Sequence, residues 1–162
     1  MSATVDSQSE PAGTITLTLE LNDGVASTPQ SVYQAEAFTS TQGRAATNAI
    51  CYLGTPYRWG GTTPRAFDCS GFVRYVYNKL GVSLPRTARQ QYKAGKVVSS
   101  GELKPGDLIF FDMMKGYVSH VGMYLGSNKF IHASTPKQGV RIDSLQKSRY
   151  KKCFVGARRF VT

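Results

Sequence analysis

The spacing of apolar residues changes near residue 95, and this change limits the chain to a mixed fold. Before it, apolar residues recur at helical intervals in three segments: 44–53, 69–80 and 87–94. After it, they alternate at period two in five short runs: 107–112, 120–125, 130–134, 140–142 and 154–161. Helices followed by strands predict an α+β domain, with the helices packed on a mostly antiparallel sheet of five to six strands.

A boundary falls near residue 40. Residues 1–40 are rich in Ser, Thr, Gln and Pro, so we expect a mobile or tether-like segment, with a strand at 15–21 where apolar and polar residues alternate. Residues 41–162 then form one domain. Because the sequence shows neither a long apolar run nor a signal peptide, we expect that any export signal or membrane tether lay in a removed N-terminal segment.

The net charge of +10 favours polyanionic partners. No nucleic-acid-binding motif is present, so we expect no nucleic acid partner, and anionic cell-wall polymers or lipid head groups fit the charge equally well. A basic surface that only serves solubility is the alternative.

The three cysteines lie far apart and form no C-x-x-C pair, which argues against a zinc ribbon. Cys51 and Cys153 stand beside apolar residues, so we expect both to be core residues, and a disulfide between them stays an alternative. Cys69 differs, because it opens the clearest helix between the small or polar residues Asp68 and Ser70.

A thiol and two imidazoles form the candidate site. The positive end of a helix lowers the pKa of a thiol, so we expect Cys69 to be a nucleophilic thiolate. The only two histidines, His120 and His132, lie in one predicted hairpin, where the first would act as base and the second would orient it. Asp68 would be the helix N-cap or a substrate contact.

Two further considerations bear on these residues. Zinc bound by Cys69, His120 and His132 is the alternative to thiol chemistry. A regular hairpin with a two- or four-residue loop would place the two histidines on opposite faces. We therefore expect an odd-length loop, a bulge near Gly122, or a His120 that precedes the ladder.

Six short motifs resemble the NlpC/P60 family of papain-like cell-wall cysteine peptidases, and most closely its single-domain murein endopeptidases. They are Tyr57–Gly61, Asp68–Val73, Leu84–Thr87, Pro105–Leu108, Ser119–Gly126 and Phe130–Ser134. The resemblance runs from about Arg44 to the C-terminus. It implies the papain-like NlpC fold, in which the catalytic cysteine starts a helix.

The resemblance also assigns roles to residues. It implies that Cys69 is the nucleophile, His120 the base and His132 the third member, with the hydroxyl of Tyr57 helping to hold the oxyanion. Asp68 and Ser70 match positions that contact the stem peptide in some members. By its charge, Arg86 could meet a carboxylate. Trp59 is expected to support its loop or to contact substrate.

The expected function is therefore a peptidoglycan endopeptidase of the periplasm or cell envelope. It would act as a monomer without a cofactor, and cut either the D-glutamyl–diaminopimelate bond or the diaminopimelate cross-link. The alternatives are a catalytically weak peptidoglycan-binding module, which would have no need of a nucleophile, and a papain-like acyltransferase or secreted effector hydrolase, which would use the same residues.

Overall fold

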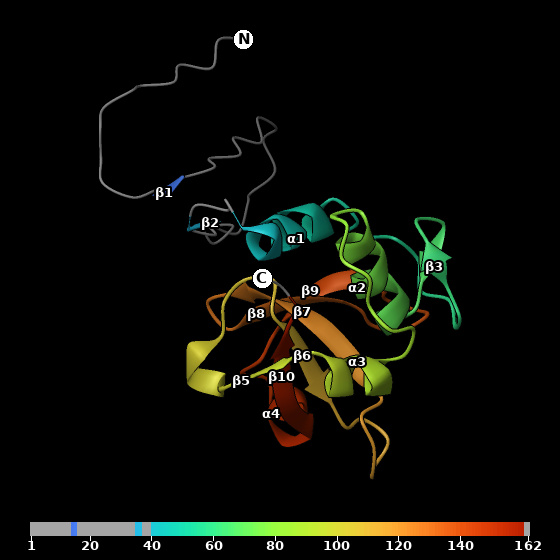
Figure 1. Ribbon diagram of the computed structural model, residues 1–162. Coiled ribbons are helices and arrows are strands. Elements are labelled where there is room, and N and C mark those ends of the chain that lie inside the picture. Colours follow the sequence, from blue (N-terminus) through green and yellow to red (C-terminus); the bar gives the residue numbers. More distant parts are fainter. Residues whose placement is uncertain (1–13, 16–34, 37–39, 161–162) are drawn as a thin grey trace, which may run out of the picture.

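A six-stranded antiparallel sheet forms the centre of the domain (Figure 1). The computed structural model describes residues 14–15, 35–36 and 40–160. In spatial order the strands are β5 (Lys96–Val98), β10 (Phe154–Arg159), β6 (Leu108–Phe111), β7 (His120–Gly126), β8 (Lys129–Ala133) and β9 (Val140–Ser144). All neighbouring strands pair antiparallel. This architecture confirms the predicted α+β class.

The structure describes five helices, and the first three of them begin at polar side chains that cap them. The five are α1 (Thr41–Ile50), α2 (Cys69–Asn78), α3 (Ala88–Ala94), the short 3-10 helix η1 (Ser100–Glu102) and α4 (Ser148–Cys153). Ser40, Asp68 and Thr87 each accept a hydrogen bond from a first-turn N–H of α1, α2 and α3, respectively. The cap at Ser40 explains why α1 starts three residues earlier than the sequence pattern predicts, and the helix also ends three residues earlier, at Ile50. The pattern did not predict α4 or β5.

Alternation along the strands creates an apolar core on each face of the sheet. One core packs α1 and α2 against strand residues such as Phe110, Val121 and Ile131. The other contains Phe111 and Phe130 and is covered by Tyr150 of α4. Figure 1 shows α1 and α2 above the sheet and α4 at its opposite side. The two faces therefore hold different helices.

A bulge in the β7–β8 hairpin decides which way its two histidines face. Ser127 and Asn128 form a two-residue turn with φ of 50° and 58°, the left-handed conformation that type I′ turns use. Gly126 pairs with Lys129, but Tyr124 pairs with Phe130, so Leu125 is an extra residue. The bulge therefore lies near Leu125 and not near Gly122, and the turn is not of odd length.

Gly122 has a different role from the one expected. A Cβ atom there would lie 2.7 Å from the ring of Phe130 and 3.2 Å from the Cβ of His132. Glycine at this position therefore leaves room for the His132 side chain on the same face.

Of the two other cysteines, both predicted to be core residues, Cys51 does not lie in the core, whereas Cys153 packs against the second core. Cys51, Cys69 and Cys153 are free thiols, so the alternative of a disulfide is excluded. Cys51 is exposed because it ends α1 as its C-cap, where the chain turns toward solvent, whereas Cys153 is half-buried.

Two pairs of very short strands form sheets separate from the main one. β1 (Thr14–Ile15) pairs with β2 (Ala35–Glu36), and β3 (Thr62–Thr63) pairs with β4 (Ala66–Phe67). Of the strand predicted at 15–21, only Ile15 belongs to the described residues, and the rest lies outside them. None of the described helices combines the length and the apolar character that a membrane crossing requires.

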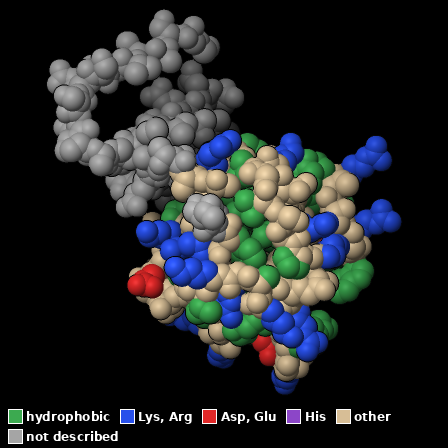
Figure 2. Space-filling model, viewed as in Figure 1, with side chains coloured by type: hydrophobic (Ala, Val, Ile, Leu, Met, Phe, Trp, Pro, Cys, Tyr) green, Lys and Arg blue, Asp and Glu red, His purple; other side chains and the backbone are tan. Residues whose placement is uncertain are grey.

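Basic side chains are spread over the surface. On the face drawn in Figure 2, Lys and Arg outnumber Asp and Glu and do not gather over a single element. With a net charge of +10, this face is therefore positive without one dominant cationic patch.

Candidate active site

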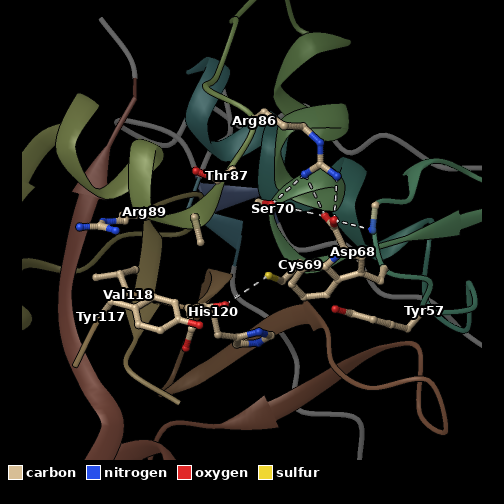
Figure 3. Close-up of a pocket in the computed structure, with 14 residues that line it drawn as sticks. Tyr57, Asp68, Cys69, Ser70, Arg86, Thr87, Arg89, Tyr117, Val118 and His120 are labelled. Atoms are coloured by element: carbon tan, nitrogen blue, oxygen red, sulfur yellow. Dashed lines mark hydrogen bonds and ion pairs between the residues drawn. The ribbon is translucent and has the colours of Figure 1, made fainter. Parts of the chain in front are cut away.

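A cavity of about 490 Å³ opens beside the first turn of α2 (Figure 3). Apart from His132, every predicted site residue lines it: Tyr57, Trp59, Asp68, Cys69, Ser70, Arg86 and His120. The opposite side is formed by Tyr117, Val118 and Arg89. The structure therefore gathers residues from three distant segments of the chain around one thiol.

Cys69 lines this cavity and is largely buried. Cys69 is the first residue of α2 and is 9% exposed, and its Sγ faces the carbonyl oxygen of Ser119 at 4.0 Å. Burial raises the pKa of Cys69 to about 11, although backbone N–H groups of Val121, Ser70 and Cys69 itself lower it. The expectation of a resting thiolate is therefore wrong. The position at the helix start does favour the anion, but burial outweighs it.

Two imidazoles and a carboxylate form a hydrogen-bonded chain that starts in the cavity. His120, the first residue of β7, places Nε2 2.7 Å from Nδ1 of His132 in β8. Nε2 of His132 lies 2.8 Å from Oδ2 of Asp143 in β9. The three side chains thus come from three adjacent strands. His132 is 1% exposed, packed between Phe130 and Tyr150.

The environment keeps both imidazoles neutral. Burial lowers the pKa of His120 to about 3, and the neighbouring His132 adds to the effect. Burial also lowers the pKa of His132, although the hydrogen bond to Asp143 opposes it. Near neutral pH, both rings are therefore uncharged.

Asp143 is the member of this chain that the sequence did not reveal. Besides His132, its carboxylate accepts hydrogen bonds from the ammonium of Lys147 and from the hydroxyl of Tyr150 at 3.2 Å. Burial opposes ionisation, but the bonds from His132 and Lys147 hold the pKa of Asp143 well below its usual range. The residue follows the predicted strand 140–142 directly, and only the pairing of β8 with β9 brings it beside His132.

A second polar cluster lies at the α2 side of the cavity. Oδ1 of Asp68 accepts hydrogen bonds from the N–H of Gly71, at 2.7 Å, and from the hydroxyl of Ser70. Both Asp68 oxygens accept from the guanidinium of Arg86, at 2.7 and 3.1 Å, and Oδ2 also accepts from Gly60 N–H. This arrangement confirms the predicted N-cap. The carboxylate that Arg86 meets belongs to the protein itself.

The loop before α2 carries two aromatic residues with different environments. Burial raises the pKa of Tyr57 to about 12, and Cys69 and Asp68 add to the effect, so the hydroxyl keeps its proton. In Figure 3 this hydroxyl lies on the side of the cavity that holds Cys69. Trp59 also lines the cavity, and it is 85% exposed. It stands free at the rim.

Glycines let this loop lie against α2. A Cβ atom on Gly71 would come within 2.1 Å of the carbonyl oxygen of Gly61, and one on Gly61 within 2.4 Å of that of Ala66. Gly60 has a φ of 79°. The backbone of the loop therefore touches the first helical turn, which brings Tyr57 and Cys69 to the same cavity.

The arrangement leaves His132 no atom for a metal. Both of its ring nitrogens are engaged, one with His120 and one with Asp143. Among the residues that the structure describes, no group of three or more His, Cys, Asp or Glu side chains is placed to hold a metal ion. The geometry therefore speaks against zinc bound by both histidines and Cys69.

Comparisons with known proteins agree with this geometry. Residues 54–159 match the NlpC/P60 family. The probable endopeptidase p60 of Listeria monocytogenes is 46% identical over 105 residues, which are 65% of this chain and 21% of that protein. The murein DD-endopeptidase MepH of Escherichia coli is 44% identical over 115 residues, which are 68% of this chain and 42% of that protein.

A solved structure shows the same fold. An NlpC/P60 family protein from Bacillus cereus superposes with a TM-score of 0.71 at 37% identity, covering 75% of this chain and 40% of that one. The chain spans less than half the length of either curated relative. The matched segment includes α2 and all three strands that carry the histidines and Asp143, and on this ground the chain belongs to the NlpC/P60 family.

Proposed function

We propose that this protein is a cysteine peptidase that hydrolyses amide bonds in the peptides of peptidoglycan. The observation that carries the proposal is the thiol of Cys69 in an open cavity, next to an imidazole whose second nitrogen is held by a buried His–Asp pair. Two relatives that are similar over this domain bear the names endopeptidase p60 and murein DD-endopeptidase.

The neutral pair of Cys69 and His120 supports attack with concerted proton transfer. The sulfur adds to the scissile carbonyl as its proton passes to His120. The backbone N–H of Cys69 and the hydroxyl of Tyr57 then stabilise the oxyanion. Collapse to a thioester expels the amine, which takes the proton from His120. Water, deprotonated by His120, releases the carboxylate and restores the thiol.

The substrate is proposed to be a stem peptide or its cross-link. We propose either the D-glutamyl–diaminopimelate bond or the diaminopimelate cross-link as the bond that is cut. Both are amides whose leaving group is an amine, so the same thiol chemistry serves each. The site of action would be the cell envelope, where peptidoglycan lies, and the net positive charge would favour approach to anionic wall polymers.

Digestion of purified sacculi tests the proposal. We expect the protein to release soluble muropeptides, whose masses identify the bond, and Cys69→Ala to release none. Cys51→Ala is the matched control, because it removes an exposed thiol outside the cavity and should keep full activity. Sacculus binding without product release would instead favour the peptidoglycan-binding module. Full activity of Cys69→Ala would refute the thiol mechanism.

A further inference from the structure

We propose that Asp143 is a positioning residue that fixes the tautomers of both histidines, so that Nδ1 of His120 is the nitrogen left free to take the thiol proton. The assignment is that of the proton positions on the two imidazoles in the resting protein. Its consequences for turnover rest on the proposed function, whereas the proton positions do not.

The hydrogen bonds around Asp143 define its protonation state. Asp143 is 4% exposed and receives hydrogen bonds from Lys147, Tyr150 and His132. Three donors around a buried carboxyl favour its ionised form, and a carboxylate can only accept. Nε2 of His132, 2.8 Å away, must therefore carry a proton.

The protonation of His132 determines that of His120. A neutral imidazole carries one proton, so His132 with a proton on Nε2 has a bare Nδ1. That atom lies 2.7 Å from Nε2 of His120, which must donate the hydrogen bond. His120 is then protonated on Nε2 and bare on Nδ1. No protein group among the described residues hydrogen-bonds to this Nδ1.

We infer that the hydrogen bond that His132 donates to Asp143, and not the electrostatic field of the surrounding cations, sets this arrangement. Arg141 pairs with His132 across the β8–β9 ladder, and its Nε lies 3.1 Å from the Asp143 carboxylate. Arg149 also faces both rings and lowers their pKa values, as Arg141 does for His132. Tyr150 packs edge-on against His132 and sends its hydroxyl to Asp143.

These cations would disfavour a protonated imidazole near the thiol. Asp143 opposes them, since its negative charge raises the pKa of both rings. The thiol proton can pass to Nδ1 of His120, while the proton on Nε2 keeps donating to His132. Asp143 exchanges no proton. Its role is to hold both imidazoles in the one tautomeric state that leaves Nδ1 of His120 free to act as the base.

Nitrogen-15 NMR of the histidine side chains tests the assignment in the unmodified protein. The chain has only two histidines, so the spectrum of His120→Gln assigns the signals of His132. At neutral pH we expect both Nδ1 atoms to be unprotonated and both Nε2 atoms to be protonated. A proton on Nδ1 of either ring would overturn the proposal, and this readout requires neither activity nor a variant of Asp143.

The variant Asp143→Asn tests how the tautomers of the two histidines affect turnover. The amide can donate to His132, which would reverse both tautomers and place a proton on Nδ1 of His120. We expect kcat to fall about 100-fold with little change in KM, and Asp143→Glu to restore part of it. The matched control is Asp107→Asn, another fully buried carboxylate, which pairs with Arg159 away from the cavity.

Asp107→Asn should lower stability and leave both the NMR pattern and kcat unchanged. If Asp143→Asn kept the parent tautomers and kcat, the proposed role would be wrong. If the parent protein showed the expected tautomers but cut no peptidoglycan, the proposed function would fail while the proton assignment stood.

Discussion

Acid should destabilise the folded domain through its two uncharged imidazoles, and His120→Gln should remove a defined part of that effect. In the folded protein, burial lowers the pKa of His120 to about 3, whereas an unfolded chain has the ordinary histidine value of about 6.5. The folded ring is therefore neutral over a range in which the unfolded ring is charged. Its contribution to stability is complete above about pH 6.5 and is lost as the pH falls toward the folded value.

The size of the effect follows from these two values. At about pH 4.5, proton uptake by the unfolded ring stabilises the unfolded state by about 2.7 kcal/mol. Because His120 lines an open cavity, solvent reduces this to about 2 kcal/mol. His132 is buried more completely and adds a further loss in the same direction. Glutamine at position 120 does not titrate, and its amide can still donate to His132.

Urea unfolding at about pH 7 and about pH 4.5 measures this difference. Far-ultraviolet circular dichroism is the suitable probe, because the single tryptophan, Trp59, is 85% exposed and its fluorescence would report folding poorly. Between about pH 7 and about pH 4.5, we expect the free energy of unfolding to fall by about 2 kcal/mol less in His120→Gln than in the parent protein. Equal falls in the two proteins would refute the assignment of His120 as an uncharged ring.

Three further predictions concern the cavity. Asp68→Ala should lower the free energy of unfolding by about 2 kcal/mol, because it removes the α2 cap and leaves Arg86 unpaired; an unchanged urea midpoint would contradict this. Tyr57→Phe should lower kcat about 100-fold at similar KM in a muropeptide assay, and an unaltered kcat would exclude its hydroxyl from the oxyanion site. The acid limb of kcat/KM should lie below about pH 6.5, because His120 must be neutral and its pKa is lowered; a limb above that value would count against this base.

The sequence predicted features that depend on neighbours along the chain. The helix that starts at Cys69, its cap at Asp68 and the strands that carry the two histidines follow from spacing and residue type alone. The sequence also indicated that the hairpin must contain an irregularity, because regular pairing would have placed His120 and His132 on opposite faces of the sheet. The site of the bulge did not, since an extra residue at Leu125 is as consistent with the pattern as one at Gly122.

What the sequence could not predict depends on tertiary packing. Asp143 directly follows the predicted strand 140–142, and aspartate is a residue type that is common in turns. Its contact with His132 depends on the register of β8 against β9. The pKa of Cys69 was predicted in the wrong direction for a related reason. The position at a helix start is visible in the sequence, but the burial that outweighs it is created by the packing of α2 on the sheet.

Acid quenching of the protein during turnover on a soluble muropeptide, followed by peptide mass mapping, tests the thiol mechanism most directly. The mechanism predicts a stem-peptide acyl group, linked as a thioester, on the fragment that contains Cys69 and none on the fragment that contains Cys51. Steady product formation with no adduct at Cys69, together with an active Cys69→Ala variant, would contradict it.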